Sequence, residues 1–386
     1  MSFCIYDSDI ALCTNEQVVI YNLENDAEQT IRLPELQIDK KIDLHNNVNI
    51  ETFHTLTNVT FSNDGKYFFV CTNRKQLCLY ERRNQNLLSN QTLVRAASKV
   101  RFTPSNDIVV ADKTGDAYLF PSNKSENGIL LLGHLSMLLD VLVTEDEKYI
   151  ITTDRDEKIR VSMFPNSYNI MSYCLGHKKF VTNILELPHD KSILVSCGGD
   201  GVFILWDYEN GKELLSVDFC NKISKNDIDN FNQKLQDCHL DETVEILPVK
   251  HLRLSVLDTT SSLVVMSFYD NSLLLAYIIS GTKDSKFKAT YIQSIILDCE
   301  PTECHFYEGN LWLLNEAGFQ VYKFEQNKFV LSDVMNFKLN RLNSLWKTLR
   351  KDSIKQNLFP ILYKRKYDNV QEYLERKKTR LSTTPE

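Results

Sequence analysis

Residues 133–162 read GHLSMLLDVLVTEDEKYIITTDRDEKIRVS, and residues 176–207 read GHKKFVTNILELPHDKSILVSCGGDGVFILWD. The Gly-His pairs that open these stretches, at Gly133 and Gly176, stand 43 positions apart, and the second stretch closes on Trp206-Asp207. Repeats of roughly 40–45 residues with Gly-His and Trp-Asp marks are the signature of a β-propeller, in which each repeat forms a blade of four antiparallel strands. Because a single blade cannot bury both of its faces, we expect further blades along the chain.

Seven segments of the chain share the pattern around Trp206, a hydrophobic alternation that follows a turn residue. The aligned positions are Tyr21, Tyr80, Phe120, Trp206 and Tyr322 and, without a final aromatic residue, Ser162 and Ala276. The alternation has the period of a strand packed between neighbouring blades. The predicted fold is therefore all-β: a seven-bladed WD-repeat β-propeller over residues 1–332, followed by a C-terminal helical extension over 333–386.

Two of the intervals between these positions are longer than one repeat. The intervals are 59, 40, 42, 44, 70 and 46 residues. The excess predicts insertions at about residues 22–47 and 219–245, of which the second is polar and acidic. Long connections run over the surface, so both should leave the rim of the propeller, with a short helix as one alternative for the second.

Two repeats carry the residue types of the hydrogen-bonded tetrad that links a loop, two strands and a turn in WD repeats. In the later repeat these residues are His177, Ser196, Asp200 and Trp206. The earlier repeat keeps His134, Thr152 and Asp156 but has Ser162 in place of the tryptophan. A buried histidine and aspartate satisfy each other's hydrogen bonds, so we interpret both sets as structural.

The C-terminal extension contains two helical patterns. Residues 334–351 have apolar side chains at mixed helical spacing and should pack on the propeller. Residues 361–381 are predicted to form an amphipathic basic helix with a regular apolar stripe. Its cations are Lys364, Arg365, Lys366, Arg376, Lys377, Lys378 and Arg380. These cations could lie along an RNA backbone or a partner helix, or simply be a solvated face.

Composition limits the class of protein. The 386 residues carry a net charge of −7, which argues against a protein that grips nucleic acid unaided, since phosphate binding needs a basic field. The 10 cysteines have no zinc-finger spacing and are expected to be reduced thiols. No signal peptide or membrane-length apolar run is found. We expect a protein of the nucleus, with the cytoplasm as a second location.

No linear motif for catalysis is present. The histidines outside the two tetrads are isolated in sequence, and no Walker A, GxGxxG, GxSxG or HExxH pattern occurs. We therefore expect neither an enzyme nor a metal or cofactor site. Two alternatives remain open: a substrate receptor of a cullin-type ubiquitin ligase and a propeller hydrolase. The receptor is disfavoured because Glu209, not arginine, stands two places after Trp206-Asp207.

The densest charge run lies on the turn and strand of one blade, residues 154–160, which read DRDEKIR. Charges of both signs suit contact with a folded protein partner, because a complementary set favours one docking and penalises others. A solvated turn is the alternative.

Several stretches resemble one family, the WD-repeat, non-catalytic subunit of the eukaryotic tRNA (guanine-N7-)-methyltransferase. They are ADKTGDAY at 111–118, GHLSMLLD at 133–140 joined to DRDEKIRV at 154–161, and the stretch from LGH at 175–177 to Asp207. A weaker similarity, to the C-terminal helix of animal members, lies in LYK at 362–364, DNV at 368–370 and YL at 373–374.

The resemblance implies a heterodimer. A separate catalytic subunit would bind S-adenosylmethionine and methylate N7 of a guanosine in the tRNA variable loop, and this chain would stabilise that subunit and help position tRNA. In the family the charged turn faces the methyltransferase. The implied contact residues are Asp154, Arg155, Glu157, Lys158 and Arg160, with Arg160 expected to form a bidentate bond to a partner carboxylate. The basic helix is the implied tRNA contact.

Overall fold

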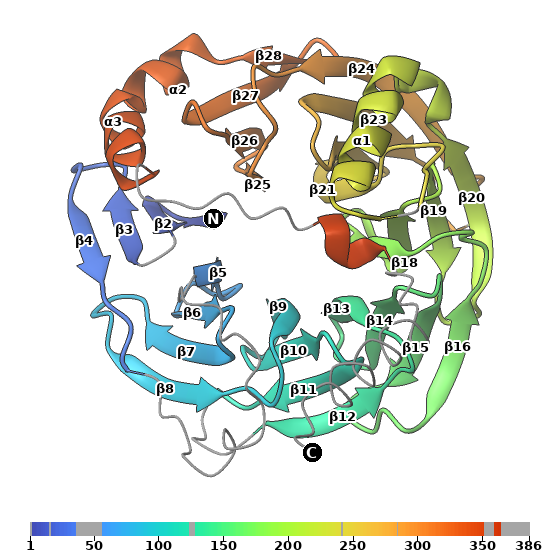
Figure 1. The fold of residues 1–386 in the computed structure, drawn as a ribbon, viewed down its shortest axis with the longest axis horizontal. Helices are drawn as coiled ribbons and strands as arrows, with labels where there is room; N and C mark the ends of the chain where they lie inside the picture. Colours follow the sequence, from blue (N-terminus) through green and yellow to red (C-terminus); the bar gives the residue numbers. More distant parts are fainter. Residues whose placement is uncertain are drawn as a thin grey trace, which may run out of the picture.

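A computed structural model shows a ring of seven four-stranded antiparallel sheets around a central axis (Figure 1). It describes residues 2–14, 17–35, 56–122, 128–240, 242–283, 285–350 and 359–363. In every sheet the four strands follow chain order from the axis outward. The seven-bladed propeller predicted from the repeats is confirmed.

The strands of the first four blades alternate in direction and are joined by short turns. Blade 1 contains β1 (Ser2–Tyr6), β2 (Asp9–Cys13), β3 (Val18–Asn22) and β4 (Glu28–Ile31). Blade 2 contains β5 (Leu56–Phe61), β6 (Tyr67–Thr72), β7 (Gln76–Glu81) and β8 (Leu87–Thr92). Blade 3 contains β9 (Ala97–Phe102), β10 (Ile108–Asp112), β11 (Asp116–Phe120) and β12 (Ile129–Gly133). Blade 4 contains β13 (Leu138–Val143), β14 (Tyr149–Asp154), β15 (Ile159–Met163) and β16 (Ile170–Cys174).

The last three blades lead into the helices. Blade 5 contains β17 (Val181–Leu187), β18 (Asp190–Gly198), β19 (Val202–Asp207) and β20 (Lys212–Asp218). Blade 6 contains β21 (Val249–Asp258), β22 (Ser261–Phe268), β23 (Leu273–Ser280) and β24 (Lys288–Ile296). Blade 7 contains β25 (Glu303–Tyr307), β26 (Asn310–Leu314), β27 (Phe319–Glu325) and β28 (Lys328–Leu331). All seven positions used to count the repeats lie in the third strand of a blade.

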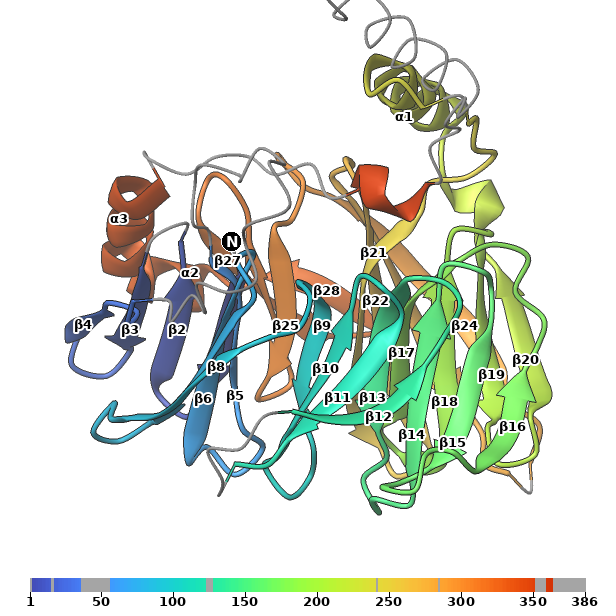
Figure 2. The same cartoon turned by 60° about the horizontal axis from the view of Figure 1, so that its bottom comes forward.

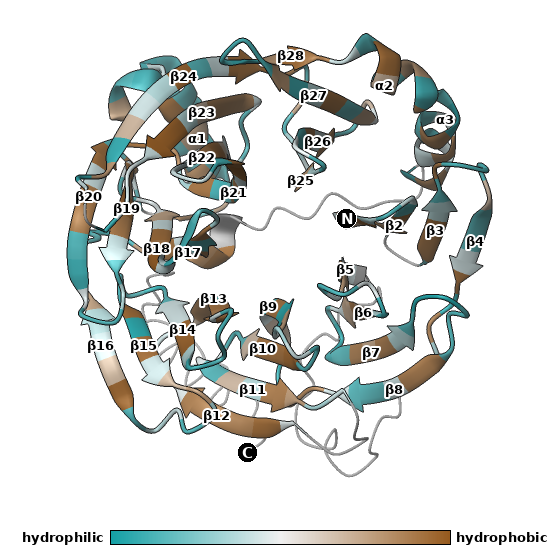
Figure 3. Cartoon of the chain, turned by 180° about the vertical axis from the view of Figure 1, so that it is seen from behind, coloured by the Kyte–Doolittle hydropathy of each residue, from teal (hydrophilic) through white to brown (hydrophobic). Residues whose placement is uncertain are grey.

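The core is divided among layers between neighbouring blades instead of forming one sphere. Ile151, Ile184 and Trp206, for example, are fully buried in the layer between blades 4 and 5. Hydrophobic colour follows the strands in Figure 3, while the turns are mostly hydrophilic. No helix among the residues that the structure describes is long and apolar enough to cross a membrane.

The predicted first insertion begins too early. Residue 22 ends β3, and β4 completes blade 1 inside the range 22–47, because Glu28–Ile31 pairs in register with the preceding strand. The insertion therefore starts after this strand, and residues 36–55 lie outside the described part of the chain.

The predicted second insertion contains a helix, which was one of the two alternatives for it. A short 3₁₀ turn η1 (Cys220–Lys222) leads to α1 (Lys225–Asp237). The hydroxyl of Ser224 caps the helix by accepting a hydrogen bond from the Asp227 N–H at 3.1 Å. Phe231 and Leu235 are the buried residues of α1. Figure 2 shows that α1 stands above one face of the disc.

The ring closes without a strand shared between its first and last blades, because β1–β4 and β25–β28 each form a complete sheet. A hydrophobic cluster joins blade 1, blade 7 and the first part of the C-terminal extension. Phe3, Trp312 and Trp346 are almost fully buried in it. Trp346 lies on α3 (Asn340–Leu349), which follows α2 (Asp333–Lys338), so the predicted docking of 334–351 on the propeller is confirmed.

Strand β28 is short, and two asparagine side chains bond to the stretch of β27 that it does not reach. The amide of Asn336 in α2 accepts from the Val321 N–H at 3.1 Å and donates to the Val321 carbonyl at 3.0 Å. The amide of Asn343 in α3 does the same for Phe319, at 2.6 Å and 3.3 Å. Each amide thus satisfies a donor and an acceptor at the outer edge of β27, where a neighbouring strand would otherwise pair.

The innermost strands are held together by ion pairs that cross between blades. Arg101 of β9 reaches Asp140 of β13 through two bonds of 3.1 Å and 2.6 Å. Arg253 of β21 reaches Glu303 of β25 at 2.6 Å. Burial alone would raise the pKa of each carboxyl, but the facing cations hold the pKa of both Asp140 and Glu303 below the ordinary values. We call these two pairs the inner belt.

The substitution Asn343→Ala tests the closure of the ring. It removes both bonds to Phe319 and leaves a backbone donor and acceptor without partners, so we expect a loss of about 1–3 kcal/mol in the free energy of unfolding. Urea unfolding measures this loss. Asn340→Ala, at an exposed position of the same helix, is the matched control. Equal losses in the two variants would contradict the proposed part of Asn343 in closure.

Acidification tests the inner belt. Because the pKa values of Asp140 and Glu303 are lower in the folded protein than in the unfolded chain, their contribution to stability is complete above about pH 5 and is lost as the pH falls further. Asp140→Asn should be less stable at about pH 7 and should lose less stability between about pH 6 and about pH 4. Urea unfolding at several pH values measures the slope. Glu308→Gln, at an exposed turn, should keep the wild-type slope, and an unchanged slope in Asp140→Asn would refute the assignment.

Candidate functional site

The predicted tetrad of blade 5 is present. His177 Nδ1 lies 2.8 Å from Asp200 Oδ2, and His177 Nε2 lies 2.7 Å from the hydroxyl of Ser196. The indole N–H of Trp206 donates to the same hydroxyl at 2.8 Å. The histidine and the indole are buried and committed to these bonds, so the four residues tie a loop, two strands and a turn together.

In blade 4 the carboxylate that meets the histidine belongs to Asp154, not to Asp156 as the alignment of the two repeats predicts. His134 Nδ1 lies 2.9 Å from Asp154 Oδ2, and its Nε2 lies 2.9 Å from the Thr152 hydroxyl. Asp154 ends strand β14 at the position that Gly198 occupies in blade 5. Glycine has no side chain to offer there, so blade 5 takes its carboxylate from the turn.

Asp154 is therefore used inside its blade. Its Oδ1 accepts the backbone N–H of Asp156 at 2.9 Å and that of Lys158 at 3.3 Å, while its Oδ2 holds His134. Burial alone would raise the pKa of Asp154, but the His134 bond and the two N–H donors lower it. The side chain is buried and bonded inside its blade, so the structure does not present Asp154 at the surface as the prediction of a partner contact requires.

Arg160 is also bonded within the blade. Its guanidinium donates to the Ser162 hydroxyl at 2.9 Å, to the Gly133 carbonyl at 3.3 Å and to the Ser167 carbonyl at 3.0 Å. Ser162, which replaces the tryptophan of the repeat, is thus a fixed acceptor for Arg160. Three of the five guanidinium N–H groups are therefore engaged within the blade, and the bidentate contact of Arg160 with a partner stays a prediction.

The rest of the charged turn lies at the surface. Glu157 and Lys158 are exposed, while Arg155 and Asp156 are half-buried. Arg155 Nη1 donates to the Ile361 carbonyl at 3.4 Å, across 206 positions of sequence. The turn and the C-terminal extension therefore meet.

The extension is anchored where it meets the turn. A 3₁₀ turn, η3 (Phe359–Leu362), brings the buried side chains of Leu362 and Tyr363 into the core beside blade 5. The ring of Tyr363 packs edge-on to Phe180 at 5.5 Å and lies 6.5 Å from Phe231 of α1. Figure 2 shows η3 and α1 on the same side of the disc. The acidic insertion, the charged turn and the extension thus converge at one place.

The predicted basic helix at 361–381 mostly lies outside the described residues. Its first residues, up to Leu362, belong instead to the short turn η3. The seven predicted RNA contacts, from Lys364 to Arg380, all follow Tyr363 and fall outside the described ranges. Their assignment stays a prediction.

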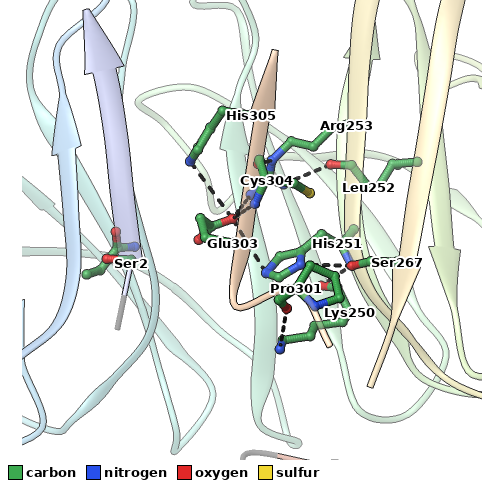
Figure 4. Close-up of polar contacts among 12 residues, drawn as sticks. Ser2, Lys250, His251, Leu252, Arg253, Ser267, Pro301, Glu303, Cys304 and His305 are labelled. Carbon is green, nitrogen blue, oxygen red and sulfur yellow. Dashed lines mark hydrogen bonds and ion pairs between the residues drawn. The ribbon is translucent and has the colours of Figure 1, made fainter. Parts of the chain in front are cut away.

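A group of polar side chains from blades 6 and 7 surrounds Glu303 on the inner strands (Figure 4). Glu303 Oε1 lies 2.6 Å from Arg253 Nη2, 3.5 Å from His251 Nε2 and 3.9 Å from His305 Nε2. Burial lowers the pKa of His305 to about 4 and holds the pKa of His251 well below its ordinary value, so both rings are neutral near pH 7. Sequence reasoning missed this group, since it regarded the two histidines as isolated.

His251, Glu303 and Cys304 together offer three groups that could hold a metal ion. The surroundings do not fit a cation. Arg253 already pairs with the carboxylate, and burial raises the pKa of the Cys304 thiol to about 12, which keeps it protonated. The contacts instead form a network of ion pairs and hydrogen bonds between the inner strands.

The only sequence signal for this network is alternation. His251 and Arg253 are two positions apart on β21, and Glu303 and His305 are two positions apart on β25. Side chains at i and i+2 share one face of a strand, so the two members of each pair lie on the same side of their strand. Pairing the two strands, however, requires knowledge of which blades are neighbours.

Comparison with known proteins supplies the family. A model described as the tRNA methyltransferase TRM82 WD40 domain matches residues 127–309. The tRNA (guanine-N(7)-)-methyltransferase non-catalytic subunit wdr4 of Xenopus laevis is 33% identical over 341 residues, which cover 84% of this chain and 79% of that protein. The WDR4 subunit of Mus musculus is 44% identical over 161 residues, 41% of this chain and 39% of that protein.

Solved structures agree on the fold. A chain of the mitotic checkpoint complex matches with a TM-score of 0.60 at 14% identity, covering 81% of this chain and 85% of that one. At this identity the likeness concerns the propeller alone. The sequence similarity to the Xenopus protein runs along most of both chains, and the chain belongs to the family of non-catalytic subunits of tRNA (guanine-N(7)-)-methyltransferase.

Proposed function

We propose that this chain is the scaffold subunit of a tRNA (guanine-N7-)-methyltransferase, which stabilises a catalytic partner and helps to position tRNA. The observation that carries the proposal is the alignment with the Xenopus subunit over 79% of that protein. S-adenosylmethionine would be bound by the partner, in a heterodimer placed in the nucleus. The alternative role as a ubiquitin-ligase receptor has no support in the names of the matched relatives.

The structure supports a scaffold in two ways. The titratable side chains around Glu303 are occupied with one another, since Glu303 pairs with Arg253 and lies close to His251. The charged turn has exposed side chains in Glu157 and Lys158, held on a turn that Asp154 fixes from within. A rigid turn suits a docking contact, because little entropy is lost when the partner binds.

The position of Tyr363 supports a role for the basic residues that follow it. Leu362 and Tyr363 are anchored beside α1 and next to the charged turn, so we expect the basic residues that follow them to begin near this turn. Cations that start beside the docked partner are placed to meet the phosphates of its RNA substrate.

Reconstitution tests the scaffold role. The chain alone should transfer no methyl group, and it should restore N7-methylation of tRNA when it is added to the purified catalytic subunit. Mass photometry or sedimentation should show a one-to-one complex. Full activity of the catalytic subunit alone, or no complex between the two, would refute the proposal.

Two truncations separate the anchor from the basic residues. A chain that ends after Tyr363 should keep its stability and its binding to the catalytic subunit, while the complex loses tRNA affinity with a smaller salt dependence. A chain that ends after residue 358 should in addition be less stable, since Leu362 and Tyr363 leave the core. Electrophoretic mobility shifts at several salt concentrations measure affinity. If the first truncation does not change tRNA affinity, the basic residues are a solvated face and do not contact RNA.

A further inference from the structure

One lysine on the innermost strands has no acidic partner. Strands β9 and β21, the innermost strands of blades 3 and 6, together carry four lysines and arginines (Figure 1). Three of them pair with a carboxylate at 2.6 Å: Arg101 with Asp140, Arg253 with Glu303 and Lys250 with Glu300. The fourth, Lys99, is half-buried and forms no hydrogen bond or ion pair with any residue that the structure describes.

The ammonium group of Lys99 lies inside the ring. Burial lowers the pKa of Lys99, and charges on three other blades act on it too, among them those of Arg253 and Glu303. These two residues belong to blades 6 and 7, which lie across the ring from blade 3 (Figure 1). The field between them and Lys99 therefore crosses the axis, so the ammonium lies on the axis side of β9.

The carboxylate beside Lys99 on the next blade has no room for another hydrogen bond. Oδ1 of Asp140 accepts from Arg101 Nε at 3.1 Å and from the Val141 N–H at 2.9 Å. Oδ2 accepts from Arg101 Nη2 at 2.6 Å and from the Ile184 N–H at 3.0 Å. A carboxylate oxygen has two lone pairs, so Asp140 cannot take Lys99 as a partner without losing a bond it already has.

Two groups of donors on β9 are thus left without an acceptor among the described residues. One is the ammonium of Lys99, and the other is the Nη1 group of Arg101, whose Nε and Nη2 hold Asp140. Lys99 and Arg101 stand two positions apart, so both side chains lie on the same side of the strand. The side chain of Arg101 is 20% exposed, so water and small ions reach this side.

The chemistry of these donors fits a small oxyanion. Ammonium and guanidinium groups form strong charge-assisted hydrogen bonds to phosphate oxygens, and one oxyanion offers several oxygens around a single centre. A second cation would be repelled, because the nearby carboxylates are already paired. A free ion is favoured over the phosphates of a folded RNA, since both side chains are half-buried on the strand nearest the axis.

We propose that the propeller binds one small inorganic oxyanion, of the class of phosphate and sulfate, between the ammonium of Lys99 and the Nη1 group of Arg101 on the axis side of β9. The ion supplies the acceptor that Asp140 does not, and it neutralises the unpaired lysine. It therefore stabilises the inner strands beside the inner belt. The site does not depend on the proposed scaffold function.

Titration with inorganic phosphate tests the site. In a chloride buffer of constant ionic strength, phosphate should bind the purified full chain at one site with a dissociation constant of about 1–10 mM, measured by calorimetry. Lys99→Met should weaken this binding by about tenfold or more, because the ammonium is lost, whereas Lys99→Arg should largely retain it. Lys347→Met is the matched control, since Lys347 is exposed on α3 at the outer rim.

Thermal unfolding gives a second measurement. A saturating rise of about 2 °C is expected for the wild-type chain at roughly ten times the dissociation constant. Lys99→Met should keep only the general effect of the salt, which does not saturate. Without phosphate, Lys99→Met should be at least as stable as the wild type, because a desolvated cation without a partner is removed.

The other outcomes overturn the proposal. If phosphate binds wild type and Lys99→Met alike, or does not bind the wild type, β9 carries no anion site. If Lys99→Met is less stable than the wild type without phosphate, the lysine has a partner within the protein and no ion is needed. If tRNA, but not inorganic phosphate, gives an effect that depends on Lys99, the ligand is not a free ion. None of these experiments uses the catalytic subunit, so the scaffold role stands or falls separately.

Discussion

The propeller depends on the contact between blade 1 and blade 7, which closes the ring although no sheet contains strands from both ends of the chain. Six junctions form between blades that are consecutive in sequence, but the seventh must join Phe3 to residues near the end of blade 7. Burial of three large aromatic side chains, with the amides of Asn336 and Asn343 in place of strand pairing, makes this junction. The cluster brings together residues more than 300 positions apart, so the apolar face of blade 1 is covered by residues from the other end of the chain.

The fold could be predicted from the sequence because its signals are local. Tyr21, Ala276 and the other repeat marks follow short alternating segments, and each lies in the third strand of a blade as the repeat requires. The tetrad around Trp206 could also be predicted, because its residues stand at the spacing typical of the repeat. The strand β4 was missed because Glu28–Ile31 has little hydrophobic alternation and is mostly exposed, so the interval after Tyr21 looked like a longer loop.

The candidate site was less predictable because it depends on side-chain direction and on blade neighbours. Alignment pairs Asp156 with Asp200, yet a side chain at the end of β14 reaches His134 first, and the sequence does not reveal which of two nearby carboxylates does so. The contact of Arg155 with Ile361 joins segments that no local pattern relates.

The burial of Leu362 and Tyr363 in the core sets a fixed point on the scaffold, and weak contacts made close to a fixed point gain effective affinity. A charged segment that diffuses freely must bind its target at the concentration of the bulk solution. One that starts from a fixed point on a docked scaffold meets the target at an effective concentration that reaches the millimolar range for short flexible connections. If a substrate is held by a subunit docked beside this point, contacts too weak to bind RNA alone would suffice to retain it, and moving the anchor would weaken retention without altering a single basic residue.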